Sequence, residues 1–264
     1  MSGLKLAALF GFYPHKLGFC GLQENSAKKT LLSYLSGEKI PEQKIRKILE
    51  TFKGAFSYYK LIAKSNRIED PFDEKVVKAY WIGNQLLEKV PVDSLKEMII
   101  KEFVGPGFLS KKIAEKKAKE VPLTSKAHHS FHVLVMGSVS DRIILEGKLL
   151  DLCRIAWGKV IRTCSLRSQD LVFSLCSEIG YKKRGTENPN RIIIEYQPLQ
   201  KRRKKYFLGE PIHKIVFWEK KFIPEIKIGD KVATHWNHIV QILSPKDLNY
   251  LKKYTQITID SLNG

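Results

Sequence analysis

Three histidines gather in one short segment of the chain. The segment AHHSFHVLVMG, residues 127–137, places His128, His129 and His132 within five positions, and an unbroken apolar run follows. Imidazole nitrogens bind zinc, nickel and iron, so these residue types suit a metal site without selecting the metal. The backbone conformation decides which of the three side chains can meet.

The run FHVLVM is typical of a strand. On a strand, His128 and His132 would lie about 13 Å apart at ~3.3 Å per residue, and His129 would face the opposite way. On a helix, His128 and His132 would be i, i+4 neighbours and could share one ion. If the strand starts near Ser130, the first two histidines lie on a loop. We expect the strand, with His128 or His129 joining a site built from distant residues.

A second histidine pair lies in VATHWNHIVQIL. A helix that begins at Thr234 would place His235 and His238 on one face, within reach of a single ion. The alternative, in which His235 and Trp236 pack at the end of a strand, is favoured. His235 is the expected partner of the first histidine cluster.

Cysteine usage is sparse and shows no C-x-x-C spacing, so reduced thiols are expected. Cys20 lies between glycines in KLGFCGL, where it could be a metal ligand or, beside a cation, a nucleophile. It could equally be a buried filler. Cys153, Cys164 and Cys176 stand in apolar contexts and are interpreted as core residues.

The segment DPFDEKVVKAYWIGN mixes aromatic and small polar residues on an expected helix. Tyr80, Trp81 and Asn84 are close enough in helical register to line a pocket, and Gly83 would allow another element to approach. A helix-packing face with Asn84 bonded to the backbone explains the same pattern. Both interpretations stay open.

The formal net charge is +19, and 36 of the 46 basic residues are lysine. Such a charge is typical of nucleic-acid binding, but a lysine-rich composition gives the same excess, and arginine is preferred for phosphate contacts. Residues 182–205 contain nine basic residues against two glutamates, with aromatic residues interleaved. A nucleic-acid surface there would use Lys182, Lys183, Arg184, Lys201, Arg202, Arg203, Lys204 and Lys205. There are two alternatives: the segment is a solvated loop, or it is a surface that binds an acidic protein partner.

Two patterns divide the chain into an expected helical part, 1–126, and an α+β part, 127–264, which could form one compact unit. Helices are expected around the apolar stripe of 45–52, after an Asp70 N-cap, at 93–103 and at 110–120 after Ser110. Short β-branched runs, including residues 171–180, then predict antiparallel strands of a curved sheet or small barrel. Helices are expected at 140–154 and, after Ser244, at 245–260.

Several function classes lack support in the sequence. No run approaches the ~18–20 apolar residues of a membrane span, and the start carries only a four-residue apolar block, so a cytoplasmic protein without membrane partners is expected. The phosphate-loop pattern and the G-x-S-x-G elbow are both missing. No reaction follows from the motifs, and whether the protein is an enzyme stays open.

The blocks LGFCG, DPFDEKVVKAYWIGN, HHSFHVL, CRIAWGKV and GDKVATHW together resemble an uncharacterised prokaryotic domain-of-unknown-function family over nearly the whole chain. Members sometimes accompany nickel-iron hydrogenase genes, which implies an accessory role in metalloenzyme maturation and a metalloenzyme partner. Where relatives carry an aromatic residue and a cysteine after the HW pair, this chain has NHIVQIL. No catalytic residue is implied.

These arguments and the resemblance give one expected site between the two parts of the chain. It would hold a small ligand or a nickel, iron or zinc ion. The expected metal ligands are Cys20, His128, His129 and His235. The expected ligand-binding residues are Tyr80, Trp81, Asn84, Arg154, Trp157 and Trp236.

Overall fold

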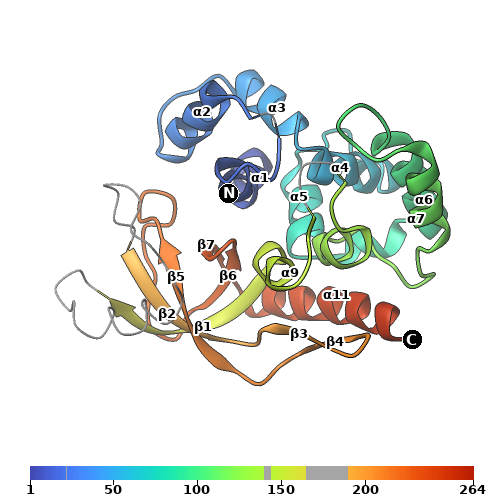
Figure 1. The fold of residues 1–264 in the computed structure, drawn as a ribbon. Helices are drawn as coiled ribbons and strands as arrows, with labels where there is room; N and C mark the ends of the chain where they lie inside the picture. Colours follow the sequence, from blue (N-terminus) through green and yellow to red (C-terminus); the bar gives the residue numbers. More distant parts are fainter. Residues whose placement is uncertain (22, 140–143, 165–189) are drawn as a thin grey trace.

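A computed structural model describes residues 1–264 except 22, 140–143 and 165–189 (Figure 1). The first half is helical, as the sequence predicts. Its elements are α1 (Gly3–Lys16), α2 (Asn25–Leu35), α3 (Glu42–Glu50), α4 (Lys53–Ser65), α5 (Glu74–Trp81), the 3-10 helix η1 (Gln85–Lys89), α6 (Val92–Glu102) and α7 (Lys111–Lys119). Helix α1 is buried along nearly its whole length, because it contacts α5 on one side and the strands of the second half on the other.

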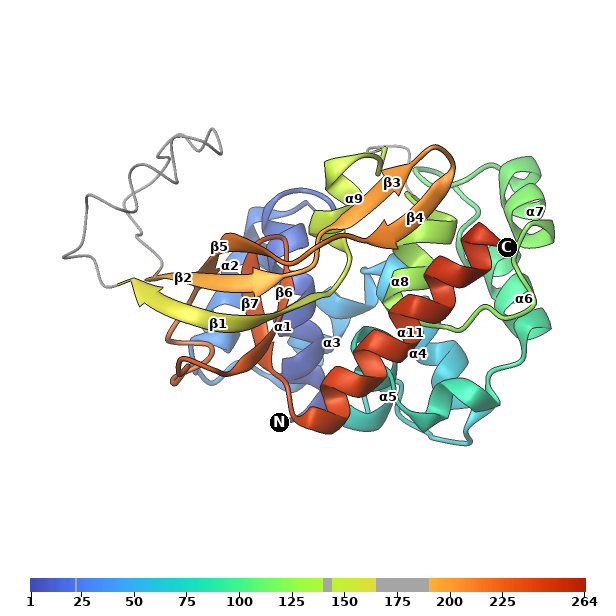
Figure 2. The same ribbon diagram turned by 90° about the horizontal axis from the view of Figure 1, so that it is seen from below.

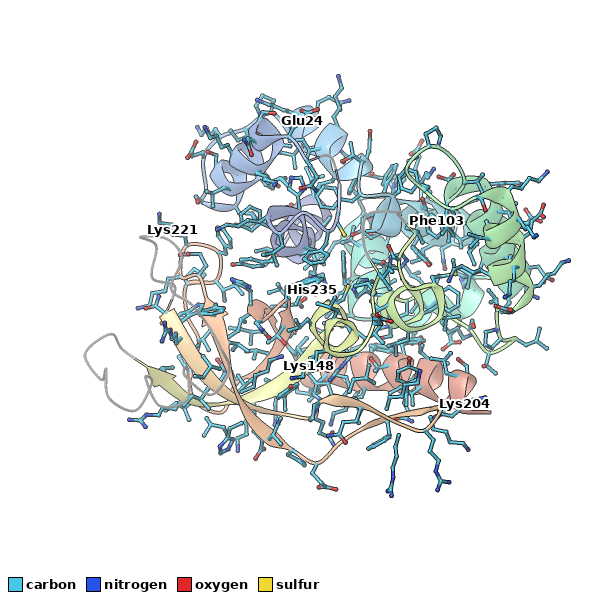
Figure 3. All side chains as sticks on the ribbon, viewed as in Figure 1. Glu24, Phe103, Lys148, Lys204, Lys221 and His235 are labelled. Atoms are coloured by element: carbon cyan, nitrogen blue, oxygen red, sulfur yellow. The ribbon has the colours of Figure 1, made fainter. Side chains whose placement is uncertain are left out.

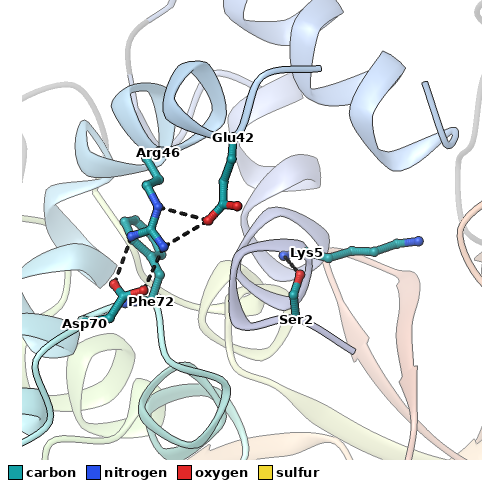
Figure 4. Close-up of polar contacts among 6 residues, drawn as sticks. All are labelled: Ser2, Lys5, Glu42, Arg46, Asp70 and Phe72. Atoms are coloured by element: carbon teal, nitrogen blue, oxygen red, sulfur yellow. Dashed lines mark hydrogen bonds and ion pairs between the residues drawn. The ribbon is translucent and has the colours of Figure 1, made fainter. Parts of the chain in front are cut away.

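The helix ends follow local side-chain chemistry. Ser110 caps α7, as expected, by accepting a hydrogen bond from the backbone of Ile113. The expected Asp70 cap is wrong: α5 begins three residues later than an Asp70 cap would give, and Asp73 is its N-cap. The carboxylate of Asp70 instead pairs with Arg46 at 2.7 Å and joins α3 to the loop before α5 (Figure 4).

The second half forms a barrel-like sheet, which confirms the α+β fold class. Its strands are β1 (Ala156–Cys164), β2 (Asn190–Tyr196), β5 (Ile212–Trp218), β6 (Lys231–His235) and β7 (His238–Ile242). They close in the order β1-β2-β5-β7-β6, with antiparallel pairs except for the parallel contact between β5 and β7. The strand expected at 171–180 lies outside the described residues.

A two-stranded hairpin, β3 (Leu199–Arg202) and β4 (Lys205–Leu208), extends beside the barrel. It runs along the C-terminal helix α11 (Pro245–Asn263) in both views (Figures 1 and 2). Asn263 fixes this contact, because its side chain accepts from the Tyr206 amide at 2.9 Å and donates to the Tyr206 carbonyl at 2.7 Å. Helix α11 begins at the expected Ser244 cap.

Residues 129–136 are helical, so the expected strand is wrong. They form α8 (His129–Phe131) and the π-helix η2 (His132–Met136), which ends at Gly137 with φ of +66°. Residues of η2 are buried around most of the helix, and a short apolar run of this kind carries no period that separates strand from helix. The helix expected at 140–154 is also shorter, since α9 spans Lys148–Cys153.

Apolar side chains of both halves share one continuous core. Helix α11 joins them, because Thr255 on α11 lies 3.0 Å from Ser130 on α8, oxygen to oxygen. Among the helices of the described ranges, none combines the length and apolar character needed to cross a bilayer. The division at residue 126 stays a prediction.

Candidate functional site

Three buried side chains converge where the two halves meet. They are His129 on α8, Cys153 at the end of α9 and His235 at the end of β6. One ligand atom of each residue lies within 4.8 Å of those of the other two. The side chains are between 1% and 7% exposed, so the cluster is shielded from bulk water. We call these three residues the His-Cys-His cluster.

The backbone holds the three elements together. The amide of Trp236 donates to the carbonyl of Leu152 at 2.9 Å, which ties the end of β6 to α9. The imidazole of His129 lies against the carbonyl of Cys153, with Nε2 2.8 Å from the oxygen. His235 occupies the centre of the molecule between the helices and the barrel (Figure 3).

The imidazole of His235 is oriented as a metal ligand. Its Nδ1 donates to the backbone carbonyl of Phe10 on α1 at 2.7 Å, which leaves Nε2 as the unprotonated nitrogen of the neutral ring. This Nε2 is buried and has no hydrogen-bond partner within the described part of the chain. A buried acceptor without a partner costs about 1–3 kcal/mol, so a ligated ion would remove an unfavourable contribution.

His129 has a polar neighbour at each ring nitrogen. Nδ1 lies 3.0 Å from the hydroxyl of Tyr80, and that hydroxyl donates to the carbonyl of Gly54 at 2.5 Å. The carbonyl of Cys153 can only accept, so Nε2 carries the proton of the neutral ring in this structure and donates to that carbonyl. Metal ligation at Nε2 would replace this hydrogen bond and move the proton to Nδ1, where the Tyr80 hydroxyl would accept it and orient the ring as outer-shell groups do in metal sites.

Burial keeps the site uncharged in the absence of a metal. It lowers the pKa of His235 to about 4 and places the pKa of His129 well below its ordinary value. Burial also raises the pKa of the Cys153 thiol well above its usual range. A cation that binds here would have to displace the thiol proton, because only the thiolate is a ligand.

The donor set fits a borderline-soft transition metal. Thiolate and imidazole bind zinc at about 2.3 Å and 2.0–2.1 Å, which puts tetrahedral ligand atoms about 3.3–3.6 Å apart. The largest separation in the cluster, 4.8 Å, must shrink by roughly 1.2–1.5 Å to reach that geometry. Small rotations of buried side chains would close the site around an ion.

A pocket of about 330 Å³ opens beside the cluster. All three cluster residues line it, together with four residues that the sequence selected: Cys20, Tyr80, Trp81 and Trp236. Burial raises the pKa of Cys20 to about 12, which disfavours an activated thiolate there. Cys20 is thus a pocket thiol outside the His-Cys-His cluster.

Trp236 reaches the pocket from a strained turn. Trp236 and Asn237 connect β6 to β7, and both have positive φ, 51° and 62°. Two residues of positive φ are typical of a type I′ hairpin, in which a bulky tryptophan is unusual. Its ring stacks on Phe19 with centroids 4.1 Å apart. The helical alternative for His235 and His238 is wrong, and the favoured interpretation, in which His235 ends a strand, is confirmed.

The remaining expected ligand residues lie elsewhere. His128 caps α8 by accepting from the Ser130 amide at 3.2 Å and lies near the ring of Tyr254. The Asn84 side chain bonds to backbone atoms and caps η1, as the packing alternative predicts. Neither residue lines the pocket described above.

Arg154 and Trp157 form a separate buried contact. The guanidinium of Arg154 binds the carboxylate of Asp151 at 2.8 Å and the carbonyl of Gln197 at 2.5 Å. Its Cζ lies 5.7 Å from the ring centroid of Trp157. This arrangement joins α9 to the barrel and lies apart from the pocket lining.

The structure describes only part of the basic surface predicted at residues 182–205. Lys182, Lys183 and Arg184 lie outside the described residues. The five consecutive residues 201–205 surround the tip of the β3–β4 hairpin, and all are exposed. We call residues 199–208 the basic hairpin.

Sequence reasoning did not select Cys153 and His132, two titratable residues that line the pocket. Cys153 is buried, as expected of a core residue, but it is also a member of the cluster. No spacing motif connects it to His129 or His235, so no sequence signal identifies this role. His132 also lines the pocket, with Nδ1 3.3 Å from the hydroxyl of Tyr58. The helical alternative for residues 127–137 named His132, but as a co-ligand of His128.

Comparisons with known proteins give a family and no activity. A family model described as a family of unknown function, DUF6390, matches residues 1–177 and 178–264. No curated protein and no solved structure matches the chain. The match over both segments confirms the resemblance drawn from the sequence blocks. The chain belongs to the DUF6390 family.

Proposed function

We propose that this protein binds one transition-metal ion through His129, Cys153 and His235, with an open coordination position that faces the pocket. The observation that carries this proposal is the convergence of three buried ligand atoms from distant parts of the chain, one of them the unpartnered Nε2 of His235. A buried polar atom without a partner is unusual, and a metal ion would satisfy it.

The ligand count supports a reactive site over a purely structural one. Structural zinc sites have four protein ligands, whereas catalytic sites have three and leave a position for water or substrate. Zinc, iron and nickel all accept imidazole and thiolate. A narrower proposal, that the ion is handled for the maturation of a metalloenzyme such as a nickel-iron hydrogenase, predicts that nickel passes from the loaded protein to an apoenzyme.

Metal analysis of untagged protein tests the proposal. We expect close to one equivalent of metal per wild-type chain after dialysis, and a loss of most of it in Cys153→Ser and His235→Asn. The matched control is His213→Asn, which changes an exposed histidine on β5 and should retain full stoichiometry. Circular dichroism checks that each variant is folded. Equal metal content in all four folded proteins would contradict the proposed site.

The basic hairpin supports a second proposal, binding of nucleic acid. Its tip carries five consecutive basic residues, Phe207 is 38% exposed, and Asn263 fixes β4 against α11. A rigid two-stranded ribbon of this kind can enter a major groove, and exposed aromatic rings stack on unpaired bases.

Binding to a labelled RNA strand and to a DNA duplex at several salt concentrations tests this second proposal. Affinity should fall linearly on a log-log plot against salt. The triple variant Lys201→Glu, Arg203→Glu, Lys205→Glu should lose binding, whereas Lys111→Glu, on α7, should not. Unchanged binding by the triple variant would remove the hairpin from consideration.

A further inference from the structure

The pocket beside the His-Cys-His cluster is nearly free of charge, in contrast to the rest of the chain. Among the described residues that line it, Lys53 is the one Lys, Arg, Asp or Glu. The Lys53 side chain is 41% exposed and its Nζ lies 4.0 Å from the carboxylate of Glu102, so it belongs to the rim. Apart from the proposed metal ion, a ligand inside the pocket meets no fixed countercharge.

Besides Lys53, the described lining consists of glycines and of apolar, aromatic, hydroxyl, thiol and imidazole side chains. It therefore holds no carboxylate, no guanidinium and no second ammonium group. An ionised group transferred into such surroundings loses hydration without a compensating partner, which is strongly unfavourable.

Aromatic rings form much of the remaining wall. Phe19 and Trp236 stack with an interplanar angle of 24°. Phe52 lies against the backbone of Gly11 and Gly21, where an added Cβ would come within 3.1 Å and 2.9 Å of its ring. The indole Nε1 of Trp236 is buried and lies near the thiol of Cys153.

The volume sets the size of the ligand. An engineered apolar cavity of about 150 Å³ holds benzene. The pocket, at about 330 Å³, therefore has room for one substituted aromatic ring or an aliphatic molecule of similar size. It is at the lower limit of the range for drug-sized ligands, roughly 300–1,000 Å³.

We infer that the pocket binds a small aromatic or aliphatic molecule that has no charge on its body and one monoanionic donor atom that occupies the open position of the metal. This inference rests on the proposed metal site. A divalent ion with one thiolate and two neutral imidazoles has a net charge of +1, so one monoanionic donor, for example a thiol that releases its proton to solvent, makes the site neutral. Carboxylates and phosphates elsewhere on the ligand are excluded by the uncharged wall.

Cobalt-loaded protein allows the metal site and the ligand to be tested separately. Cobalt addition should produce thiolate-to-cobalt charge-transfer absorption in the wild type and in His213→Asn, and not in Cys153→Ser. Without this band in the wild type, the proposed metal site fails. With the band present, the ligand test proceeds on the same sample.

The ligand test compares two thiols of matched size, 4-(mercaptomethyl)benzamide and 4-(mercaptomethyl)benzoate. We expect the neutral amide to increase the charge-transfer absorption and to bind at least tenfold more tightly than the benzoate. Benzyl mercaptan, which is smaller and apolar, should bind as well. If neither neutral thiol alters the cobalt spectrum, or if the benzoate binds as tightly as the amide, the inference is wrong even though the metal site stands.

Discussion

The pocket and the basic hairpin are opposites in charge and in exposure. The pocket is enclosed by aromatic, histidine and cysteine side chains that burial keeps neutral, whereas the hairpin displays five consecutive cationic residues to solvent. Figure 3 shows His235 inside the molecule and Lys204 at the outer end of the hairpin. The net charge of +19 therefore describes the surface and says nothing about the ligand of the pocket.

This contrast separates the two proposals physically. The two regions share no residue, and long-range electrostatic effects of the hairpin are screened over about 10 Å at 0.1 M salt. Changes in one region should leave the function of the other intact.

Metal binding should increase the free energy of unfolding strongly. Substitutions in the basic hairpin should not alter that increase. At free metal 1,000-fold above Kd, a ligand that binds only the folded state adds about 4 kcal/mol to the free energy of unfolding. Urea unfolding with and without zinc measures this difference. Cys153→Ser should show little stabilisation, and the hairpin triple variant should show the full value. Equal stabilisation of Cys153→Ser would place the ion elsewhere.

Acid should destabilise the metal-free protein through its buried histidines. The pKa values of His132 and His235 are lowered to about 4 in the folded state, while the unfolded chain titrates near 6.5. The unfolded state then binds more protons between pH 6.5 and 4, so the free energy of unfolding falls as the pH falls through this window. Each histidine contributes up to about 1.4 kcal/mol per pH unit.

Urea titrations between pH 7 and 4.5, with a chelator present, measure the slope. His132→Gln should reduce it by about one proton, and His213→Asn is the matched exposed control. A free energy of unfolding that is constant from pH 7 to 5 would contradict the neutral, buried state of these imidazoles.

Removal of the Tyr80 hydroxyl should weaken metal binding without abolishing it. Outer-shell partners of ligating histidines typically contribute a factor of about 10–100 in metal affinity. Tyr80→Phe should lower affinity by that factor, because the Nδ1 proton of His129 loses its acceptor. Tyr58→Phe is the matched control, since its hydroxyl contacts His132 instead. Competition with a chromophoric chelator gives the constants, and equal affinities for both variants would refute the orienting role.

Charge reversal in the basic hairpin should have the smallest effect on stability. The changed side chains of Lys201, Arg203 and Lys205 are exposed, and such substitutions usually alter the free energy of unfolding by less than about 0.5 kcal/mol. Thermal unfolding of the triple variant tests this, and nucleic-acid binding should be lost at the same time. A large drop in stability would show that the hairpin is a structural element, and the loss of nucleic-acid binding could then not be assigned to its charge.

The sequence predicted those helices and strands that have a clear capping residue or a clear hydrophobic period. Ser110 and Ser244 mark helix starts through their hydroxyl caps, and alternating β-branched runs predict the barrel strands. The helix at residues 132–136 was predicted as a strand because the run is short and mostly buried. Its helix is also of the rare π type. The prediction that Asp70 is a helix N-cap was wrong because its carboxylate forms an ion pair with Arg46, which is distant in sequence.

The site was partly predictable for a different reason. Residue type alone marked His129, His235, Cys20 and Trp236 as chemically capable, and the structure brings all four to one pocket. Cys153 could not be selected, since its proximity to His129 and His235 depends on how α8, α9 and β6 meet. His128 was equally plausible by type, but it faces Tyr254 and caps α8 instead.

Anomalous X-ray diffraction at the absorption edge of the bound metal, from crystals of metal-loaded protein, locates the ion directly. We expect one strong peak within about 2.0–2.3 Å of Nε2 of His235, Sγ of Cys153 and a ring nitrogen of His129. A peak at any other group of residues, or no peak at this cluster under saturating metal, would contradict the proposed metal site.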